Sequence, residues 1–506
     1  MGDRLALGAF LTVAAALVLV GCAAVGPNFQ APHGPVAAGY AGAGDRAAAI
    51  AVLSSDTRPS GPWWRAMGSR DLDAVMTLAL AHNQTAAAAE ATLERARAQA
   101  EREGARRYPT VAAAAAYERE RINIASLGFS GFHSPTIGLY SIGPSVSYDL
   151  DVFGGQRRRI EAARATAQAQ SFRADAAYLT LTGDVALEAV RIAGLRAEIE
   201  TVEGVVTDDR HAIDIAAKAE AAGGQPVSVG LGGKLQLQED LSLLPPLSQQ
   251  LAQARHALAL LVGEPPGDWS APNFAVDGFA PPSIIPVAVP SLLVRRRPDI
   301  QAAEADLHAD TAQIGVQTAR LYPDIKLVAG LTQEALTPGP LFNSTSAAYN
   351  FGPIINAPLF DGGAIRADRR AALAQARAAL AQYRQTVITA FVQVSDVLSA
   401  LARDDERLAT LGRAETTARS SLDDSREAYR LGGAPLTDVV VADRQWRRAS
   451  LAKVVAIGQR LADIVALYGA TASDWRPPPA RDPDPVGGKT WRPGGAKPLA
   501  STGQYP

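Results

Sequence analysis

The chain has 506 residues, and its 49 lysines and arginines nearly balance its 51 aspartates and glutamates, leaving a formal net charge of −2. This balance excludes an electrostatic case for nucleic-acid binding, which depends on an excess of basic side chains. Aromatic residues make up only 6% of the sequence and alanine is abundant, which favours long, closely packed helices. No apolar run of about 18 residues follows residue 20, so we expect no transmembrane helix, and any membrane crossing would use strands.

The beginning of the chain has the pattern of a bacterial lipoprotein signal. Arg4 precedes the apolar stretch 5–20, as in a secretory signal peptide. Cys22 follows a small residue at the end of this stretch and is the only cysteine in the chain. We therefore predict a signal peptide over residues 1–21, a covalent lipid on Cys22 and a lipidated extension over residues 22–70. No aspartate follows the cysteine, which favours the outer membrane. The alternative is a buried cysteine inside an unprocessed signal.

An internal duplication organises the rest of the sequence. Three anchors recur in the same order at nearly one offset: Tyr108 with Tyr322 (322 − 108 = 214), Phe153 with Phe360 (360 − 153 = 207), and Gly223 with Gly432 (432 − 223 = 209). Such self-similarity indicates two copies of one structural unit. We place the first repeat at residues 71–290, the second at 291–472, and a disordered tail rich in proline and glycine at 473–506.

Both repeats are predicted to follow one plan, in which a helix precedes two strands and a long helical hairpin. In the first repeat the elements are expected at 71–106 (helix), 110–120 and 140–150 (strands), 156–222 (long helix) and 234–262 (return helix). In the second they are expected at 299–320 (helix) and at 325–333 and 349–360 (strands). A helix of about 67 residues then follows residue 363 and, at ~1.5 Å per residue, measures roughly 100 Å.

Prolines and glycines are expected to disturb the first return helix. Pro245 and Pro246 should kink it, because proline removes a backbone donor and clashes with the preceding turn. Gly230, Gly232 and Gly233 each cost roughly 1 kcal/mol relative to alanine in a helix, so this helix is expected to begin late or to fray.

Apolar heptads predict that the second hairpin packs as a coiled coil. Steps of three and four residues separate the apolar positions of both helices: Val387, Phe391, Val394, Leu398 and Leu401, and then Val454, Ile457, Leu461, Ile464 and Tyr468. We interpret the acid-first pairs Glu415–Arg419 and Asp443–Arg447, and the acidic cluster at residues 404–406, as solvated faces of these helices.

The residue types that carry catalysis or metal binding do not gather in this sequence. The six histidines stand singly, without the spacing of metal ligands. No glycine-rich loop ends in the lysine and hydroxyl residue of a phosphate-binding loop, and no serine stands in a nucleophile elbow. We therefore predict that the protein is not an enzyme and has no cofactor apart from the lipid on Cys22.

A series of motifs resembles the outer-membrane factor family of tripartite efflux systems, the TolC-like channels, and within it the OprM/NodT-type lipoprotein branch. The motifs span residues 19–470 in the order found in that family: Gly21-Cys22 with Val25-Gly26-Pro27-Asn28-Phe29, Trp63-Trp64, Asp151-Val152-Phe153-Gly154, Leu244-Pro245, Leu260-Leu261-Val262-Gly263-Glu264-Pro265-Pro266, Arg296-Arg297-Pro298-Asp299-Ile300, Phe360-Asp361-Gly362-Gly363 and Tyr429-x-x-Gly432.

The resemblance implies a homotrimer in which four strands from each chain close a 12-stranded membrane β-barrel, leaving no open sheet edge in lipid. The long coiled-coil helices would form a periplasmic α-barrel, so the implied fold class is mainly α with a membrane β-barrel. The implied function is that of a passive duct in the cell outer membrane. It would carry small molecules from an inner-membrane pump, of RND type in this branch, and a periplasmic adaptor would dock onto it.

The resemblance also assigns roles to particular residues. The turns that close the two hairpins would be the tips that contact the adaptor: Gly223, Gly224, Pro226, Val227 and Ser228, and then Gly432, Gly433, Pro435, Leu436 and Thr437. Asp438 falls on the first position of an acidic ring that constricts the pore in the family, and such a ring would favour cations. The next acidic position falls on Val441, and Asp443 is displaced by two residues.

Two other classes of protein share part of this pattern. A periplasmic adaptor lipoprotein also uses a long helical hairpin, but it carries one hairpin rather than two at a single repeat offset. A structural envelope lipoprotein without channel activity, such as a soluble coiled coil, would explain the helices. A soluble coiled coil would explain neither the repeated strand pairs nor the lipoprotein signal, and a structural envelope lipoprotein should not form conducting trimers.

Overall fold

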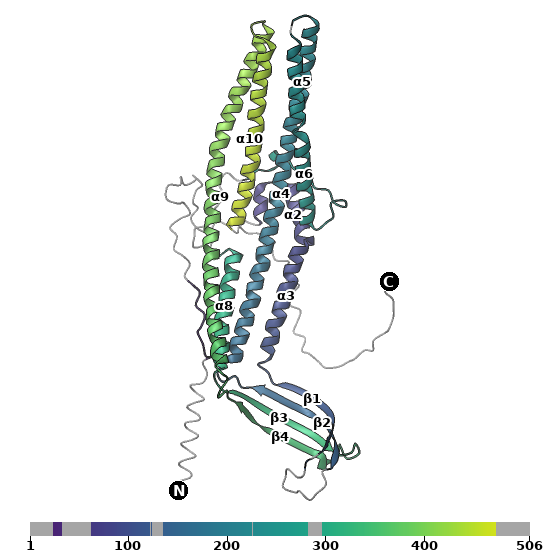
Figure 1. The fold of residues 1–506 in the computed structure, drawn as a ribbon, viewed down its shortest axis with the longest axis vertical. Helices are drawn as coiled ribbons and strands as arrows, with labels where there is room; N and C mark the ends of the chain where they lie inside the picture. The colour runs from purple at the N-terminus through teal and green to yellow at the C-terminus, as the bar shows by residue number, and fades with distance from the viewer. Residues whose placement is uncertain are drawn as a thin grey trace.

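The computed structural model describes residues 24–32, 62–121, 123, 135–224, 226–281 and 296–471. Over these residues the chain forms an elongated body of helices with one four-stranded sheet at its end (Figure 1). The predicted signal peptide at 1–21, Cys22 and the predicted tail at 473–506 lie outside the described residues and stay predictions.

Four strands form one antiparallel sheet in the order β1-β2-β3-β4: β1 (Thr110–Arg121), β2 (Thr136–Asp149), β3 (Asp324–Ala335) and β4 (Ala347–Asn356). The two sequence halves meet where β2 pairs with β3, with Val146 opposite Ala329. Every residue of β1 is exposed, as are large side chains of β4 such as Tyr349 (86%) and Phe351 (79%). Within the described chain the outer edges of β1 and β4 have no partner strand, which leaves the sheet open at both sides.

The strand boundaries lie within two residues of the prediction except at the start of β2 and the end of β4. β2 begins at Thr136 instead of residue 140, and Gly138 lies within the strand at a position where a Cβ would come within 2.8 Å of the Tyr117 ring. β4 ends at Asn356 instead of residue 360.

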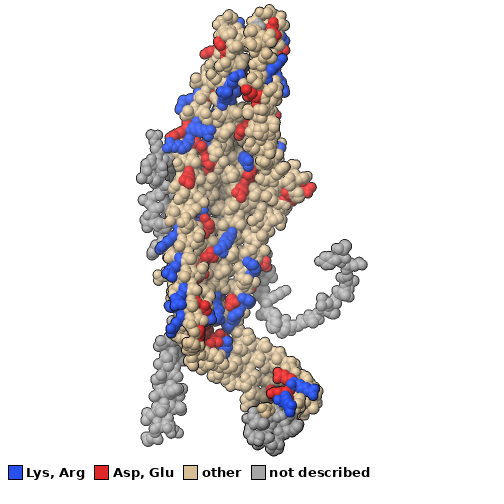
Figure 2. Space-filling view, in the orientation of Figure 1, with Lys and Arg blue, Asp and Glu red and all other residues tan. Residues whose placement is uncertain are grey.

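Charged residues of the sheet lie at its two ends. At the end next to the helices stand Asp149, Asp324 and Lys326, and at the far end stand Glu334 and residues 118–121. The strand residues between these ends carry no charge, and Figure 2 shows this largely uncharged middle beside the charged helical body. An uncharged band between polar ends is the pattern expected of strands in a lipid bilayer.

Two helices of 67 residues each form the axes of the helical body, namely α4 (Gly155–Ala221) and α9 (Ala364–Arg430). The predicted length of the second long helix is therefore confirmed. The shorter helices are α2 (Arg70–His82), α3 (Gln84–Ala105), α5 (Val227–Leu241), α6 (Leu244–Val262), α8 (Pro298–Ala319) and α10 (Leu436–Ala470), with 3-10 turns η1 (Trp63–Met67), η3 (Val276–Gly278) and η4 (Ser344–Ser346).

The helix predicted at 71–106 is two helices that divide at Asn83. This residue adopts an extended conformation, with φ −64° and ψ 122°, and its side-chain oxygen accepts a hydrogen bond from the Ala86 amide at 2.9 Å. Asparagine is a strong N-cap because it satisfies an otherwise unpaired amide of the first turn. The apolar periodicity alone did not reveal this break.

The first return helix differs from its prediction in where it begins and in what the prolines do. It begins at Val227 and passes through the three glycines, so the expected late start is wrong. The interruption falls instead at residues 242–243, between α5 and α6. Pro245 and Pro246 occupy the first turn of α6, where a missing amide hydrogen removes no helical bond. The prolines therefore begin a new helix rather than kinking a continuous one.

Each long helix is accompanied by shorter helices arranged head to tail (Figure 1). Asn83 at the start of α3 donates from Nδ2 to the carbonyl oxygen of Leu261 near the end of α6, at 2.9 Å. Arg297 before α8 donates from Nη1 to the carbonyl oxygen of Ala470 at the end of α10, also at 2.9 Å. The two contacts occupy equivalent positions, since 297 − 83 = 214 and 470 − 261 = 209, the offsets of the repeat anchors.

The main apolar core lies where these helices meet. Trp63 stacks on Tyr468 at 5.0 Å between ring centroids and donates from Nε1 to the Thr182 hydroxyl at 3.3 Å. The predicted heptad seam of the second hairpin is confirmed by buried side chains on both of its helices: Val387, Val394, Leu401, Leu461, Ile464 and Tyr468.

One expectation about apolar runs is wrong. α9 contains an 18-residue stretch with a mean hydropathy of 1.3, so by length and composition alone it could cross a membrane, although only 22% of the stretch is buried. The stretch is more apolar than one packing seam requires, since it also carries Ile388 and Val392, whose side chains are about half exposed. A helix with apolar side chains on more than one face needs a second packing partner.

Candidate gate and docking region at the helical tips

The same backbone turn closes both hairpins. Gly223 and Gly432 adopt left-handed φ values of 77° and 76°, which residues with a Cβ adopt only with strain. The following amides, of Gly224 and Gly433, each donate at 2.8 Å to the carbonyl five residues earlier, which completes a Schellman motif. The glycines are therefore required by backbone geometry, as the sequence predicted for a tight turn.

The residues predicted to contact an adaptor all lie at these two turns, at the end of the body far from the sheet (Figure 1). All of them are exposed except Leu436, which is only 5% exposed, whereas its counterpart Val227 is 58% exposed. The buried Leu436 supports its own hairpin, and the exposed residues remain predicted contacts.

Asp438, the predicted gate residue, is exposed in the first turn of α10. Its amide donates to the Pro435 carbonyl oxygen at 3.1 Å. A carboxylate near a helix N-terminus is stabilised by the aligned peptide dipoles, which suffices to explain aspartate at this position. Its role in a pore stays a prediction.

A nearby ion-pair network connects the two hairpins. Arg447 of α10 is only 8% exposed and pairs with Asp443 on its own helix. The same guanidinium reaches Asp208 of α4 at 3.0 Å, and Arg426 of α9 reaches Asp443 at 3.4 Å. The network therefore holds α10 against the long helix of the other hairpin. The ion pairs of a buried arginine between two carboxylates are costly to break, because loss of one partner leaves a buried charge without compensation.

A cleft of about 330 Å³ lies beside this network, between α4, α5, α9 and α10. Asp209 of α4 faces Asp240 of α5 there. Burial, and then the hydrogen bond and charge of Asp240, raise the pKa of Asp209 to about 6, although the charge of Arg447 opposes the rise. The region thus combines a fixed ion pair with a carboxyl pair that changes its protonation in mildly acidic solution.

Sequence reasoning placed these charges on solvated faces, and for Arg447 that interpretation is wrong. The predicted pair with Asp443 exists, but a helix from the first sequence half covers it. The predicted Glu415–Arg419 pair is replaced by two others, since Glu415 pairs with Lys453 at 2.6 Å and Arg419 with Asp423 at 3.3 Å. Spacing along one helix identifies possible partners but carries no information about the helix that packs against it.

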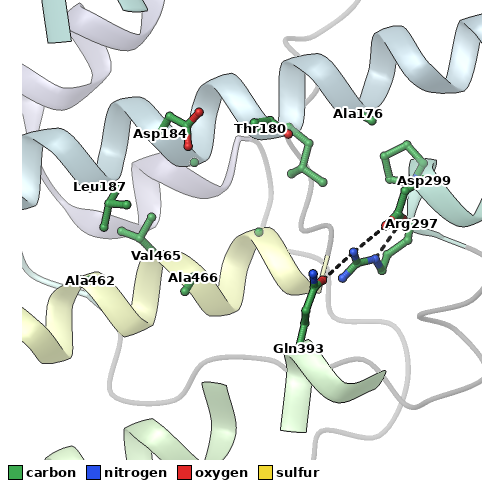
Figure 3. Close-up of a pocket in the computed structure, with 14 residues that line it drawn as sticks. Ala176, Thr180, Asp184, Leu187, Arg297, Asp299, Gln393, Ala462, Val465 and Ala466 are labelled. Atoms are coloured by element: carbon green, nitrogen blue, oxygen red, sulfur yellow. Dashed lines mark hydrogen bonds and ion pairs between the residues drawn. The ribbon is translucent and has the colours of Figure 1, made fainter. Parts of the chain in front are cut away.

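A second cleft, of about 350 Å³, lies at the junction of α8 and α10 and is shown in Figure 3. Arg297 points across it, with its guanidinium bonded to both carboxylate oxygens of Asp299 at 2.6 and 3.0 Å and to Gln393 of α9 at 2.8 Å. Asp184 of α4 lines the same cleft, and burial raises its pKa above the ordinary value. The hydrogen bonds of Arg297 connect α8, α9 and α10.

Comparison with known proteins places this arrangement in a family. The model of the family described as outer membrane efflux protein matches residues 75–264 and 289–473. The pyoverdine export outer membrane protein OpmQ of Pseudomonas aeruginosa is 28% identical over 84% of this chain and 90% of its own length. Outer membrane protein OprJ of the same species is 28% identical over 90% of this chain and 94% of its own length. The solved structure of the outer-membrane channel OprN has a TM-score of 0.80 and 26% identity, covering 90% of this chain and 100% of that one.

The comparisons and the geometry agree on the architecture. The solved channels combine an α-barrel with a β-barrel, and one open four-stranded sheet with a long helical body is what a single chain contributes to such a channel. Channels of this family are trimers that work with adaptors and inner-membrane pumps. The chain therefore belongs to the outer membrane efflux protein family and is an outer-membrane channel of an efflux pump.

Proposed function

We propose that three copies of this chain form the passive exit duct of an RND-type tripartite pump. The observation that carries the proposal is the sheet, whose middle is uncharged and whose edge strands β1 and β4 have no partner strand among the residues that the structure describes. Lipid offers no hydrogen-bond partners to an open edge, so neighbouring copies would have to supply them. Closing three four-stranded sheets into one barrel meets that requirement.

The adaptor would dock at the two tips. Their exposed glycines and prolines form rigid turns with open surfaces, and they lie at the end opposite the sheet. The lipid on Cys22 would provide a second membrane attachment beside the barrel, since one acyl anchor gives only moderate membrane binding. Mass spectrometry of the intact mature protein tests the lipid directly, because diacylation at a new N-terminal cysteine adds a defined mass.

Single-particle averaging of the protein extracted from outer membranes tests the assembly. The expected result is a threefold particle with a helical section of roughly 100 Å, the length of a helix of about 67 residues. Monomers, or particles without this section, would contradict the duct and favour an adaptor or a structural envelope lipoprotein.

We further propose that the tip region closes the duct at rest. The Arg447 bridge would hold α10 close to α4, and Asp438 would contribute to a narrow acidic ring. Arg447→Met is expected to increase single-channel conductance severalfold in planar bilayers, because it releases α10 from Asp208. Asp438→Ala is expected to increase conductance and to reduce the preference for cations.

Arg448→Met is the matched control for the bridge, since Arg448 is the exposed neighbour on the same helix. Equal conductance in the Arg447 and Arg448 variants would show that the bridge does not close the duct. An Asp438→Ala channel with the conductance and ion preference of the parent would remove Asp438 from the gate.

A further inference from the structure

The helices α3 and α9 lie at opposite sides of the helical body. Within one subunit α3 packs on α4, and α9 packs on α8 and α10, so α4 and α8 lie between them (Figure 1). α3 leads into the edge strand β1 through residues 106–109, and α9 follows the other edge strand, β4, after residues 357–363. Pairing of β4 of one copy with β1 of the next would therefore bring α9 of the first copy beside α3 of the second.

Both helices carry a face of alanines spaced by heptads. All six side chains are exposed: Ala91, Ala98 and Ala105 on α3, and Ala367, Ala374 and Ala381 on α9. Seven residues make nearly two helical turns, so each set lies on one side of its helix. Because α3 runs toward the sheet and α9 runs away from it, the two alanine faces can pack as a close antiparallel pair.

Charged side chains flank both alanine faces at the same helical position. On α3, Glu94 and Glu101 each follow an alanine of the face by three residues (94 − 91 = 3). On α9, Arg370, Arg377 and Arg384 do the same (377 − 374 = 3). In an antiparallel pair of helices, flanking positions with the same offset lie on the same side of the contact, where coiled coils form their interhelical ion pairs. The glutamates of one copy thus face the arginines of the next.

The opposite flanks bring no like charges together. The residues that follow the alanines by four positions are Arg95 and Arg102 on α3 (95 − 91 = 4), but Ala371, Ala378 and Gln385 on α9. The arginines of α3 therefore face uncharged side chains. Opposite charges meet on one flank and no charges oppose each other on the other, which is the complementarity that favours one partner and one register.

The charged flank has few contacts within its own subunit. Arg377 donates from Nε to the carbonyl oxygen of Leu373 on the same helix, at 3.4 Å. All five side chains of the flank are exposed, and none forms an ion pair with a residue that the structure describes. The flank is therefore available to a second copy.

Apolar side chains continue the contact beyond α3. The helix α6 extends the line of α3, since Asn83 at the start of α3 donates to the Leu261 carbonyl oxygen at 2.9 Å. Leu260 of α6 is 75% exposed. One heptad beyond the alanine face of α9, Ile388 and Val392 are 51% and 50% exposed. Leu260 of one copy would cover these two side chains of the next and remove apolar surface from water.

The edge strand alone fixes the register between copies poorly. β1 contains five consecutive alanines at residues 112–116, so both faces of the strand carry the same side chain there. A slip of one or two residues between β4 and β1 of neighbouring copies would therefore change little in the packing of these side chains. Charges seven residues apart on two rigid helices match in one register.

We propose that α9 docks on α3 of a second copy, with Arg370 beside Glu101 and Arg377 beside Glu94, and that this charge ladder sets the register in which neighbouring copies assemble. The proposal rests on the proposed trimeric duct. Ala105 and Ala367 are the face residues nearest the sheet. With these two side by side, the opposed heptads pair the alanines at 98 and 374, and those at 91 and 381.

Cysteine cross-linking in outer membranes tests the contact and its register. Ala98→Cys and Ala374→Cys in one chain are expected to give covalent dimers and trimers on oxidation. Ala98→Cys with Ala381→Cys is the matched control. Its partner is displaced by about 10 Å along the helix, beyond the ~7 Å between Cα atoms that a disulfide spans. Ala98→Cys alone should give no dimer.

Exchange of the charges tests the ladder. Glu94→Arg and Arg377→Glu are each expected to lower the heat-resistant trimer fraction about fivefold at equal expression, because a like-charge pair replaces an ion pair at each subunit contact. The double variant is expected to regain the fraction of the parent. Arg95→Glu reverses a charge on the other flank of α3 and should leave the fraction unchanged.

Each contrary result has its own consequence. Equal cross-linking by the two cysteine pairs would overturn the register, and threefold particles without cross-links would overturn the helical contact. A double charge variant that is no better than the single variants would overturn the ladder. Monomeric particles of the parent would overturn the trimeric duct, and the docking with it.

Discussion

Arg297→Met is expected to destabilise the protein by about 3 kcal/mol, the usual cost of removing one partner from a buried ion pair. Arg297 is 8% exposed and connects Asp299, Gln393 and the Ala470 carbonyl oxygen. Its charge lies at the C-terminal end of α10 and that of Asp299 at the N-terminal end of α8, so both charges also stabilise the helix ends. Methionine replaces the unbranched part of the arginine side chain and leaves all three groups without their donor. The measurement is the denaturation midpoint of the purified protein, followed by circular dichroism.

The first repeat provides a matched comparison for this variant. Asn83→Ala removes the equivalent junction contact, to Leu261, together with the cap of α3. Its expected cost is about 1 kcal/mol, since the contact is neutral and replaceable by water. Equal costs for the Asn83 and Arg297 variants would show that the charge at the second junction contributes nothing beyond a helix cap.

Asp404→Asn is expected to stabilise the protein at pH 7.5 by about 1–2 kcal/mol and to flatten the pH dependence of its stability. Asp404 of α9 is 7% exposed and lies within hydrogen-bond reach of Asp463 on α10. Burial, and then the hydrogen bond and charge of Asp463, raise the pKa of Asp404 to about 6, against the opposing charges of Arg407 and Arg460. Asparagine imitates the neutral carboxyl group and removes the repulsion.

The direction of the pH effect follows from the two pKa values. The folded protein binds this proton below about pH 6 and the unfolded chain only below about 3.8. The contribution to stability is therefore fully present below pH 3.8 and is lost as the pH rises through 6. A rise from 3.8 to about 6 corresponds to at most roughly 3 kcal/mol, and relaxation of the helices reduces it. Asp209 contributes with the same sign.

Denaturation midpoints measured between pH 4 and 8 test this prediction. Asp405→Asn is the control, because Asp405 is the exposed neighbour that pairs with Arg460 at 2.7 Å. It should leave the slope between pH 4 and 6 unchanged. A slope that survives in Asp404→Asn would contradict the assignment of the proton to the Asp404–Asp463 pair.

Sequence reasoning succeeded where the chemistry is local. The turns at Gly223 and Gly432 require a left-handed backbone, which glycine supplies, and the heptad positions around Val394 and Leu461 form the seam that their spacing predicts. The family, the open four-stranded sheet and the efflux channel follow from motifs that stand in one order along the chain. The tip contacts, Asp438 and the lipid on Cys22 are still predictions.

Sequence reasoning failed where a helix from the other half of the chain sets the environment. Residues 404–406 read as one solvated cluster, yet Asp404 is buried against α10 while Asp405 is not. Arg447 read as half of an exposed pair, yet it reaches Asp208, far away in the sequence. The contact of residues 24–32 with α4, in which the Arg158 guanidinium donates to the side-chain oxygen of Asn28 at 2.7 Å, could not be predicted from periodicity or spacing.

The sequence by itself determined the strands, the long helices, the turn backbone and the family of this channel. These features depend on the dihedral preferences and side-chain period of neighbouring residues, which each segment carries within itself. Only the tertiary structure decided where α2 separates from α3, which charges are buried, and that Asn83 and Arg297 join the shorter helices end to end. Burial of a charge is a property of the space between elements, and its energy depends on partners that the local sequence does not contain.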